Sequence, residues 1–262
     1  MENTAFPKVI ITDRELALIK GIAKHISKNV LMKCKKVFET KDKWDKFMHS
    51  WSAFSTNRIS YFEQFPEKLR PYIRHIKDVQ ADDNCGFRAT AGLIGLGEDD
   101  WQQVRRNLMT KLHSNVVHYV QLFGSQERVD ELNSILSYFE PSPGFNHWMT
   151  MPDMGHLIAS YYRVVLYHLS MQQCLTFLPL RSVPIATPDR RDIYIGFVNG
   201  NHFVQVYLQP GHLVPPIANN WIRFHHPCAI GWDKAYTIRI QQFRTLISPD
   251  VITTETIDIE EL

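Results

Sequence analysis

Residues 82–88 read DDNCGFR and run directly into ATAGLI at residues 89–94. The polar turn, followed by small and apolar residues, predicts a helix over residues 85–96. Cys85 would then stand at the N-terminus of a helix, where the dipole and free backbone amides favour a thiolate over a thiol. The amides of Cys85 and of the preceding Asp83 and Asn84 would point to where a tetrahedral oxyanion forms.

Two interpretations of Cys85 stay open on this local pattern. A free cysteine is usually a small buried hydrophobic residue, whereas the polar turn before Cys85 favours a nucleophile. A thiolate nucleophile needs a base within hydrogen-bonding reach. The best candidate among the 12 histidines is His202, which follows the Asn-Gly turn at residues 199–200 and begins a strand-like run. The two residues are 117 positions apart, so only the fold can bring them together.

The remaining pattern places helices in the first half of the chain and a small sheet in the second. Apolar spacing predicts helices over residues 67–76, 99–123, 126–138 and 153–161. Strand-like runs follow at residues 163–168, 175–178, 193–198 and 202–208. We therefore expect a mixed layer of helices and strands.

Composition is that of a globular protein. The chain has 262 residues, of which 44% are hydrophobic and 21% charged, with a net charge of +2. These values exclude a histone-like polyanion binder. No apolar run approaches the roughly 20 residues of a membrane span, and no signal peptide is expected. Four scattered cysteines, at positions 34, 85, 174 and 228, predict neither a disulfide framework nor a zinc cage, and favour a reducing compartment, the cytoplasm or the nucleus.

The two ends of the chain differ in charge. Residues 1–60 carry 12 Lys or Arg against 6 Asp or Glu, whereas residues 249–262 carry 5 acids and no Lys or Arg. Weak contact with nucleic acid through residues 1–60 stays open beside the simpler interpretation of a solvated helix face. The acidic tail is interpreted as solvated. Near the tail, His225, His226 and Cys228 form a short cluster without a second ligand pair at zinc spacing.

The DDNCGFR stretch resembles the nucleophile motif Asp-Gly-x-Cys of the ovarian-tumour (OTU) family of cysteine proteases. Residues 193–206 (IYIGFVNGNHFVQV) look like the histidine strand of that family, and residues 154–161 (MGHLIASY) resemble the helix before its central strand. The resemblance covers residues 70–210. It implies an α+β fold, a small central, mostly antiparallel or mixed sheet flanked by helices, with an N-terminal helical extension. It also implies that Cys85 is the nucleophile and His202 the general base, and that no cofactor or metal takes part.

The resemblance leaves the third residue of the site to be chosen. Some OTU proteases use the Asp three residues before the cysteine, which here is Asp82. Others use an Asp or Asn two residues after the histidine, where this chain has Val204, which cannot accept a hydrogen bond. We therefore favour Asp82 as the acid, with a helix N-cap as its alternative role. Asp83 replaces the Gly of the motif and brings negative charge near the oxyanion site, with Asn84 beside it.

Residues 6–18 and 25–30 resemble the second catalytic strand, and the helix that follows it, of Mutator-like element (MULE) transposases. Such enzymes need three carboxylates around two metal ions, and Asp13 supplies one. We expect three parts: a mostly helical transposase-derived remnant at residues 1–57, an OTU-like protease domain at residues 58–210, and a C-terminal extension with an acidic tail at residues 211–262.

The OTU resemblance implies a deubiquitinase, a thiol-dependent hydrolase that cleaves isopeptide bonds at the C-terminus of ubiquitin. Ubiquitin or a ubiquitinated protein would be its partner, and no membrane is expected. The alternative is a catalytically inactive module of OTU fold, from a domesticated transposable element, that binds ubiquitin or another protein. The position of Asp83 and the absence of an acid after His202 motivate that alternative.

Overall fold

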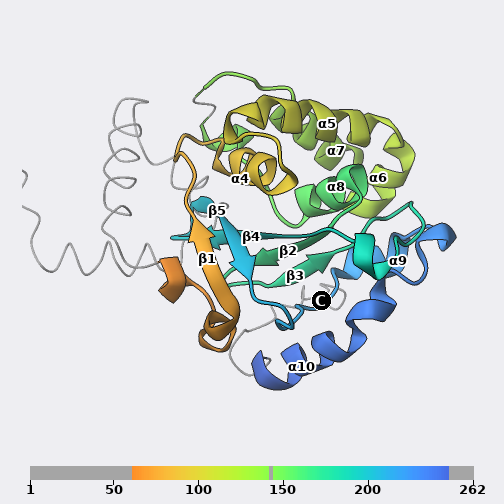
Figure 1. The fold of residues 1–262 in the computed structure, drawn as a ribbon. Helices are drawn as coiled ribbons and strands as arrows, with labels where there is room; N and C mark the ends of the chain where they lie inside the picture. The colour runs from red at the N-terminus through yellow and green to blue at the C-terminus, as the bar shows by residue number, and fades with distance from the viewer. Residues whose placement is uncertain (1–60, 142–143, 248–262) are drawn as a thin grey trace, which may run out of the picture. The chain divides into compact units, whose positions relative to one another are not determined.

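The fold is built around a five-stranded mixed sheet (Figure 1). The computed structural model describes residues 61–141 and 144–247. The strand order is β1-β5-β4-β2-β3; β2 and β4 run parallel, and the other neighbouring pairs are antiparallel. The strands are β1 (Ile73–Lys77), β2 (Val165–Leu169), β3 (Leu175–Phe177), β4 (Asp192–Val198) and β5 (His202–Leu208). The predicted α+β class, a small mixed sheet flanked by helices, is confirmed.

Helices cover both faces of this sheet. One face carries the helices α4 (Cys85–Ile94), α5 (Trp101–His113), α6 (Val116–Phe123), α7 (Gln126–Leu136) and α8 (Asp153–Tyr162), and α10 (Thr237–Ile247) lies on the opposite side (Figure 1). The remaining α-helix of the described residues is α9 (Asn219–Phe224). Short 3-10 helices are η1 (Tyr61–Gln64), η2 (Glu67–Tyr72), η3 (Glu98–Asp100), η4 (Phe145–His147), η5 (Thr187–Asp189), η6 (Pro227–Ala229) and η7 (Asp233–Tyr236).

Helix α4 lies unusually close to β5 because two of its residues have no side chain. A Cβ atom at Gly86 would stand 3.0 Å from the Phe203 ring, and one at Gly92 would stand 2.3 Å from Nε2 of Gln205. Both distances are shorter than an ordinary contact, so a larger residue at either position would require Phe203 or Gln205 to shift. The close approach brings the N-terminus of α4 to the beginning of β5.

Two of the predicted elements are wrong in part. The helix predicted over residues 67–76 is the 3-10 helix η2 followed by β1. Pro71 lies near the end of η2 and has no N–H to donate in a longer α-helix, and the chain is extended from Ile73 onward. The helix predicted over residues 99–123 is divided into α5 and α6 at residues 114–115. At this break the Ser114 hydroxyl donates a hydrogen bond to the Lys111 carbonyl. The predicted Asn-Gly turn is confirmed, with φ of 55° at Asn199 and 73° at Gly200.

The proposed transposase remnant at residues 1–57, its possible contact with nucleic acid and the acidic tail lie outside the described residues. Residues 211–247 of the predicted C-terminal extension contact the sheet, and Ile217 bridges to Thr176 of β3. No helix in the described part of the chain is long and apolar enough to cross a membrane.

Candidate active site

Cys85 is the first residue of α4, as predicted from the polar turn. Its side chain is 5% exposed, and the backbone N–H of Phe203 on β5 donates to Sγ at 3.4 Å. A donor aimed at sulfur stabilises negative charge there. Within residues 61–141 and 144–247, the Cys85 N–H has no hydrogen-bond acceptor, as is usual in the first turn of a helix. It can therefore donate to an oxyanion.

His202 is the first residue of β5 and is nearly buried, at 7% exposed. Nε2 of its ring lies 2.7 Å from Oδ1 of Asp78. Burial alone would lower the pKa of His202, but the hydrogen bonds and charges of Asp78 and Cys85 outweigh it and raise the pKa to about 9. The ring is therefore positively charged at neutral pH, held between a carboxylate and a sulfur.

Asp78 follows β1 directly and is fixed by three donors. Oδ1 accepts from His202 and, at 2.9 Å, from the Val79 N–H; Oδ2 accepts from the Tyr61 hydroxyl at 3.0 Å. Burial raises the pKa of Asp78, but these hydrogen bonds and the charge of His202 lower it further than burial raises it. Tyr61 also lies near the imidazole, with the two ring centroids 6.0 Å apart.

Asp82, favoured from sequence as the partner of His202, lies elsewhere. Its Oδ2 pairs with Nη2 of Arg88 at 2.7 Å, and Oδ1 accepts from the Asn84 N–H at 3.2 Å. The helix N-cap is Asn84, so the alternative role for Asp82 is not observed either. The prediction is wrong because the DDNCGFR stretch contains its own cation. Arg88 pairs with the Asp82 carboxylate, which is therefore not available to His202.

Asp78 was missed because β1 was predicted to be helical. The register of β1 and β5 pairs Lys77 with Gln205, so the residue after Lys77 lies beside the beginning of β5. Recognising residues 73–77 as a strand antiparallel to β5 would have placed Asp78 next to His202. Pro71 is the sequence signal for that, because it argues against a helix through residue 76.

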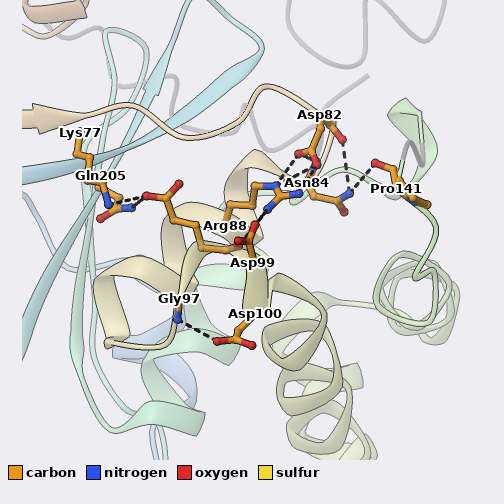
Figure 2. A network of polar contacts seen from close by, with 10 residues as sticks. Lys77, Asp82, Asn84, Arg88, Gly97, Asp99, Asp100, Pro141 and Gln205 are labelled. Carbon is orange, nitrogen blue, oxygen red and sulfur yellow. Dashed lines mark hydrogen bonds and ion pairs between the residues drawn. The ribbon is translucent and has the colours of Figure 1, made fainter.

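The turn before Cys85 is held by buried polar contacts (Figure 2). The Asn84 amide donates to the Pro141 carbonyl at 3.1 Å, and its Oδ1 accepts from Nη2 of Arg105 at 2.7 Å. Asn84 and Arg105 are both fully buried. Because the Asn84 N–H donates to Asp82 and the Asn84 side chain is engaged, the prediction that this residue donates to an oxyanion is not supported. Within residues 61–141 and 144–247, the N–H groups of Asp83 and Cys85 have no acceptor, so both stay candidates for that role.

Asp83 adopts the left-handed conformation that glycine prefers, with φ of 64°. Its Oδ2 accepts from the Gly144 N–H at 3.2 Å, which ties the turn to the segment after residue 143. Burial raises the pKa of Asp83, and the hydrogen bond from the Gly144 N–H opposes that rise. The carboxylate is therefore engaged in a structural contact.

Two other histidines illustrate why His202 is the candidate base. His156 and His168 lie in the core, where burial lowers their pKa to about 3 and about 4. Both are neutral at pH 7. In the described part of the chain, no group of three or more His, Cys, Asp or Glu could hold a metal ion.

Comparisons with known proteins were made at three levels. No family model matches the chain. No curated protein matches its sequence. Among solved structures, the chain is similar to the viral OTU domain protease from Dera Ghazi Khan virus, with a TM-score of 0.41 and 12% identity over 56% of this chain and 86% of that one.

Two further solved structures are similar to a comparable extent. The Hazara virus OTU, solved bound to ubiquitin, gives a TM-score of 0.39 at 12% identity over 54% of this chain and 84% of that one. The OTUD1 OTU domain gives 0.36 at 14% identity, over 54% of this chain and 91% of that one.

Proposed function

We propose that this chain is an OTU-like cysteine hydrolase that cleaves isopeptide bonds at the C-terminus of ubiquitin. The observation that carries the proposal is the convergence of Cys85, His202 and Asp78, with a 2.7 Å bond from imidazole to carboxylate and a His202 pKa of about 9. Ubiquitin as the substrate comes from the resemblance of residues 82–88 and 193–206 to the OTU motifs.

Acylation would begin from a thiolate on Cys85 and an imidazolium on His202. The sulfur attacks the scissile carbonyl carbon, a C–S bond forms, and the carbonyl electron pair moves to oxygen. The Cys85 N–H donates to that oxyanion. When the C–N bond breaks, His202 gives its proton to the departing amine, leaving a thioester on Cys85 and a neutral imidazole.

Deacylation uses the same residues in reverse. Neutral His202 takes a proton from a water molecule as the water attacks the thioester carbon, and the C–S bond then breaks. The products are a carboxylic acid at the C-terminus of ubiquitin, which becomes the carboxylate by releasing its proton to solvent, and the original thiolate–imidazolium pair. Asp78 keeps the ring oriented and stabilises its positive charge through both steps.

A ubiquitin derivative with a thiol-reactive C-terminus tests the proposal. We expect the wild-type protein to form a covalent adduct, Cys85→Ala to form none, and Cys228→Ala to react as the wild type does. The Cys228 variant is the matched control because this thiol also lies beside an imidazole, at 3.0 Å from His226. A folded wild-type protein that stays unlabelled would contradict the enzymatic proposal.

A catalytically inactive binding module is the second candidate function. The low exposure of the Cys85 residue, 5%, favours it, because a substrate carbonyl must reach the sulfur. Calorimetric titration with ubiquitin separates the two candidates. Binding without adduct formation supports the inactive module, and adduct formation that needs Cys85 supports the hydrolase.

A further inference from the structure

Each of the three candidate catalytic residues belongs to a different element. Asp78 follows β1, Cys85 begins α4, and His202 begins β5. A short segment, η3, contacts all three elements through polar groups (Figure 2). It lies four residues after α4 ends and supplies no atom to the site itself.

The side chain of Glu98 in η3 joins the two strands. Its Oε1 accepts from Nζ of Lys77 at 2.6 Å and from Nε2 of Gln205 at 3.1 Å. Lys77 precedes Asp78, and Gln205 lies three residues after the histidine of β5. Gln205 is 1% exposed and its Oε1 accepts from the Tyr207 hydroxyl at 2.8 Å, so its amide has a fixed orientation.

The main chain of Glu98 joins the same segment to α4. Nη1 of Arg88, which lies one turn after the cysteine of α4, donates to the Glu98 carbonyl at 3.3 Å and to Oδ1 of Asp99 at 3.0 Å. The same guanidinium holds Asp82 in the turn before the helix, as Figure 2 shows. The Arg88 side chain is only 9% exposed, so this ion pair is little screened by water.

We propose that Glu98 is a positioning residue that holds the Cys85 helix at a fixed separation from the Asp78–His202 pair. The inference rests on the proposed function, because it assigns a role within that same site. Glu98 touches neither sulfur nor imidazole. It acts through Lys77 and Gln205, and its carbonyl fixes Arg88. A displacement of about 1 Å between reacting groups can reduce a rate about 100-fold, so a contact that fixes two strands and a helix matters for reactivity.

The experiment measures the second-order rate of Cys85 alkylation by iodoacetamide between pH 6 and pH 10, with the modified peptide quantified by mass spectrometry. In the wild type, the imidazolium should keep the sulfur reactive at neutral pH. In Glu98→Ala we expect a rate about tenfold lower at pH 7, because a displaced ring no longer stabilises the thiolate. Near pH 10 the rates should converge, since His202 has then lost its proton in both proteins and its position no longer brings a positive charge to the sulfur.

Two further variants make the result specific. Glu98→Gln keeps an acceptor for Gln205 but loses the charge that pairs with Lys77, so its rate at pH 7 should lie between those of the wild type and Glu98→Ala. It also serves if the alanine variant does not fold. Glu131→Ala is the matched control, because Glu131 forms an ion pair with Arg128 on α7. Its pH profile should equal that of the wild type.

A purely structural role would lower thermal stability in Glu98→Ala while leaving the pH profile unchanged, and that result overturns the inference. The proposed function fails separately. If the ubiquitin probe leaves the wild type unlabelled but Cys85 alkylation depends on Glu98, the inference stands and ubiquitin cleavage does not. If the probe labels the wild type and the pH profile of Glu98→Ala equals that of Glu131→Ala, the proposed function stands and the inference about Glu98 fails.

Discussion

The described part of the chain contains two pairs of cysteine and histidine in contact, Cys228 with His226 and Cys85 with His202, and the two pairs are built differently. In the first, Sγ of Cys228 lies 3.0 Å from Nδ1 of His226, two residues away on the same surface segment. That Nδ1 also accepts from the Cys228 N–H at 3.2 Å. His226 is exposed, and among the described residues its Nε2 has no hydrogen-bond partner.

The pair of Cys85 and His202 is assembled from a helix and a strand that lie 117 residues apart in the chain. Here the imidazole is buried and its Nε2 faces Asp78, and a strand amide donates to the sulfur. The difference teaches that contact between thiol and imidazole arises easily between near neighbours. A carboxylate on the far nitrogen and removal from water are what hold the charge on the ring, and these need a folded core.

Replacing Asp78 with Asn removes the carboxylate that distinguishes the pair of Cys85 and His202 from the pair of Cys228 and His226. This variant should have the largest effect on reactivity. Without the carboxylate, the pKa of His202 falls from about 9, because the hydrogen bond and charge of Asp78 are lost and only those of Cys85 still oppose the effect of burial. We expect labelling by the ubiquitin probe at pH 7 to slow about 100-fold. NMR titration of the His202 ring measures the pKa directly.

Asp130→Asn is the matched control for that variant. Asp130 is an exposed carboxylate on α7 that accepts a hydrogen bond from Gln126, so its loss should leave both the titration and the labelling rate unchanged. A His202 pKa that stays near 9 in Asp78→Asn would show that the carboxylate does not charge the ring.

The residues of the candidate site differ in how far the sequence predicts their positions. A polar turn before Cys85 and the Asn-Gly turn before His202 are local signals, and both residues begin the predicted elements. Asp78 depends on the pairing of β1 with β5, which local spacing cannot give: Leu69, Ile73 and Ile76 have helical spacing. The mistake about Asp82 is of the same kind, because choosing between Arg88 and His202 requires knowing where each lies.

The buried residues that hold the turn before Cys85 could not be predicted from the sequence for a different reason. Arg105 has the sequence signature of a surface residue, yet it is fully buried and donates to Asn84 in the turn before Cys85. Burial lowers its pKa to about 9, against the opposing charge of Asp82. Composition predicts charged residues on the surface, so a buried cation that holds the turn before Cys85 is visible only in the fold.

The stability of the folded protein should depend on pH through the protonation of His202. The pKa of His202 is raised from its ordinary 6.5 to about 9, so the folded state holds the proton more tightly than the unfolded state. The stabilisation by Asp78 is then fully present below pH 6.5 and is lost as pH rises through 9. We expect the free energy of unfolding of the wild type to exceed that of Asp78→Asn by about 2 kcal/mol at pH 6.

Urea denaturation at pH 6 and pH 9.5 measures this difference, which should shrink at the higher pH. His226→Ala supplies the contrast with the second pair. That histidine is exposed and has no carboxylate partner among the described residues, so its replacement should change stability by the same small amount at both pH values. An Asp78 effect that is equal at the two pH values would mean that His202 is not the group responsible.

The variant with the smallest expected effect tests whether the Asp78 carboxylate must be oriented as well as present. Tyr61→Phe removes the hydroxyl that donates to Oδ2 of Asp78 and keeps the ring near His202. Burial and the Asp78 charge raise the pKa of Tyr61 to about 12, so the hydroxyl stays protonated throughout the working range. We therefore expect labelling to slow about threefold, and by the same factor from pH 6 to pH 9, for loss of one hydrogen bond worth about 0.6 kcal/mol.

Tyr161→Phe is the matched control, since Tyr161 lies on the exposed end of α8 and its hydroxyl has no partner among the described residues. Its labelling rate should equal that of the wild type. A threefold loss in Tyr61→Phe that does not change with pH would mean that Asp78 acts through its orientation, because loss of charge, as in Asp78→Asn, changes the pKa of His202 and therefore the shape of the profile. Equal rates in the two tyrosine variants would mean that His202 and the Val79 amide hold the carboxylate by themselves.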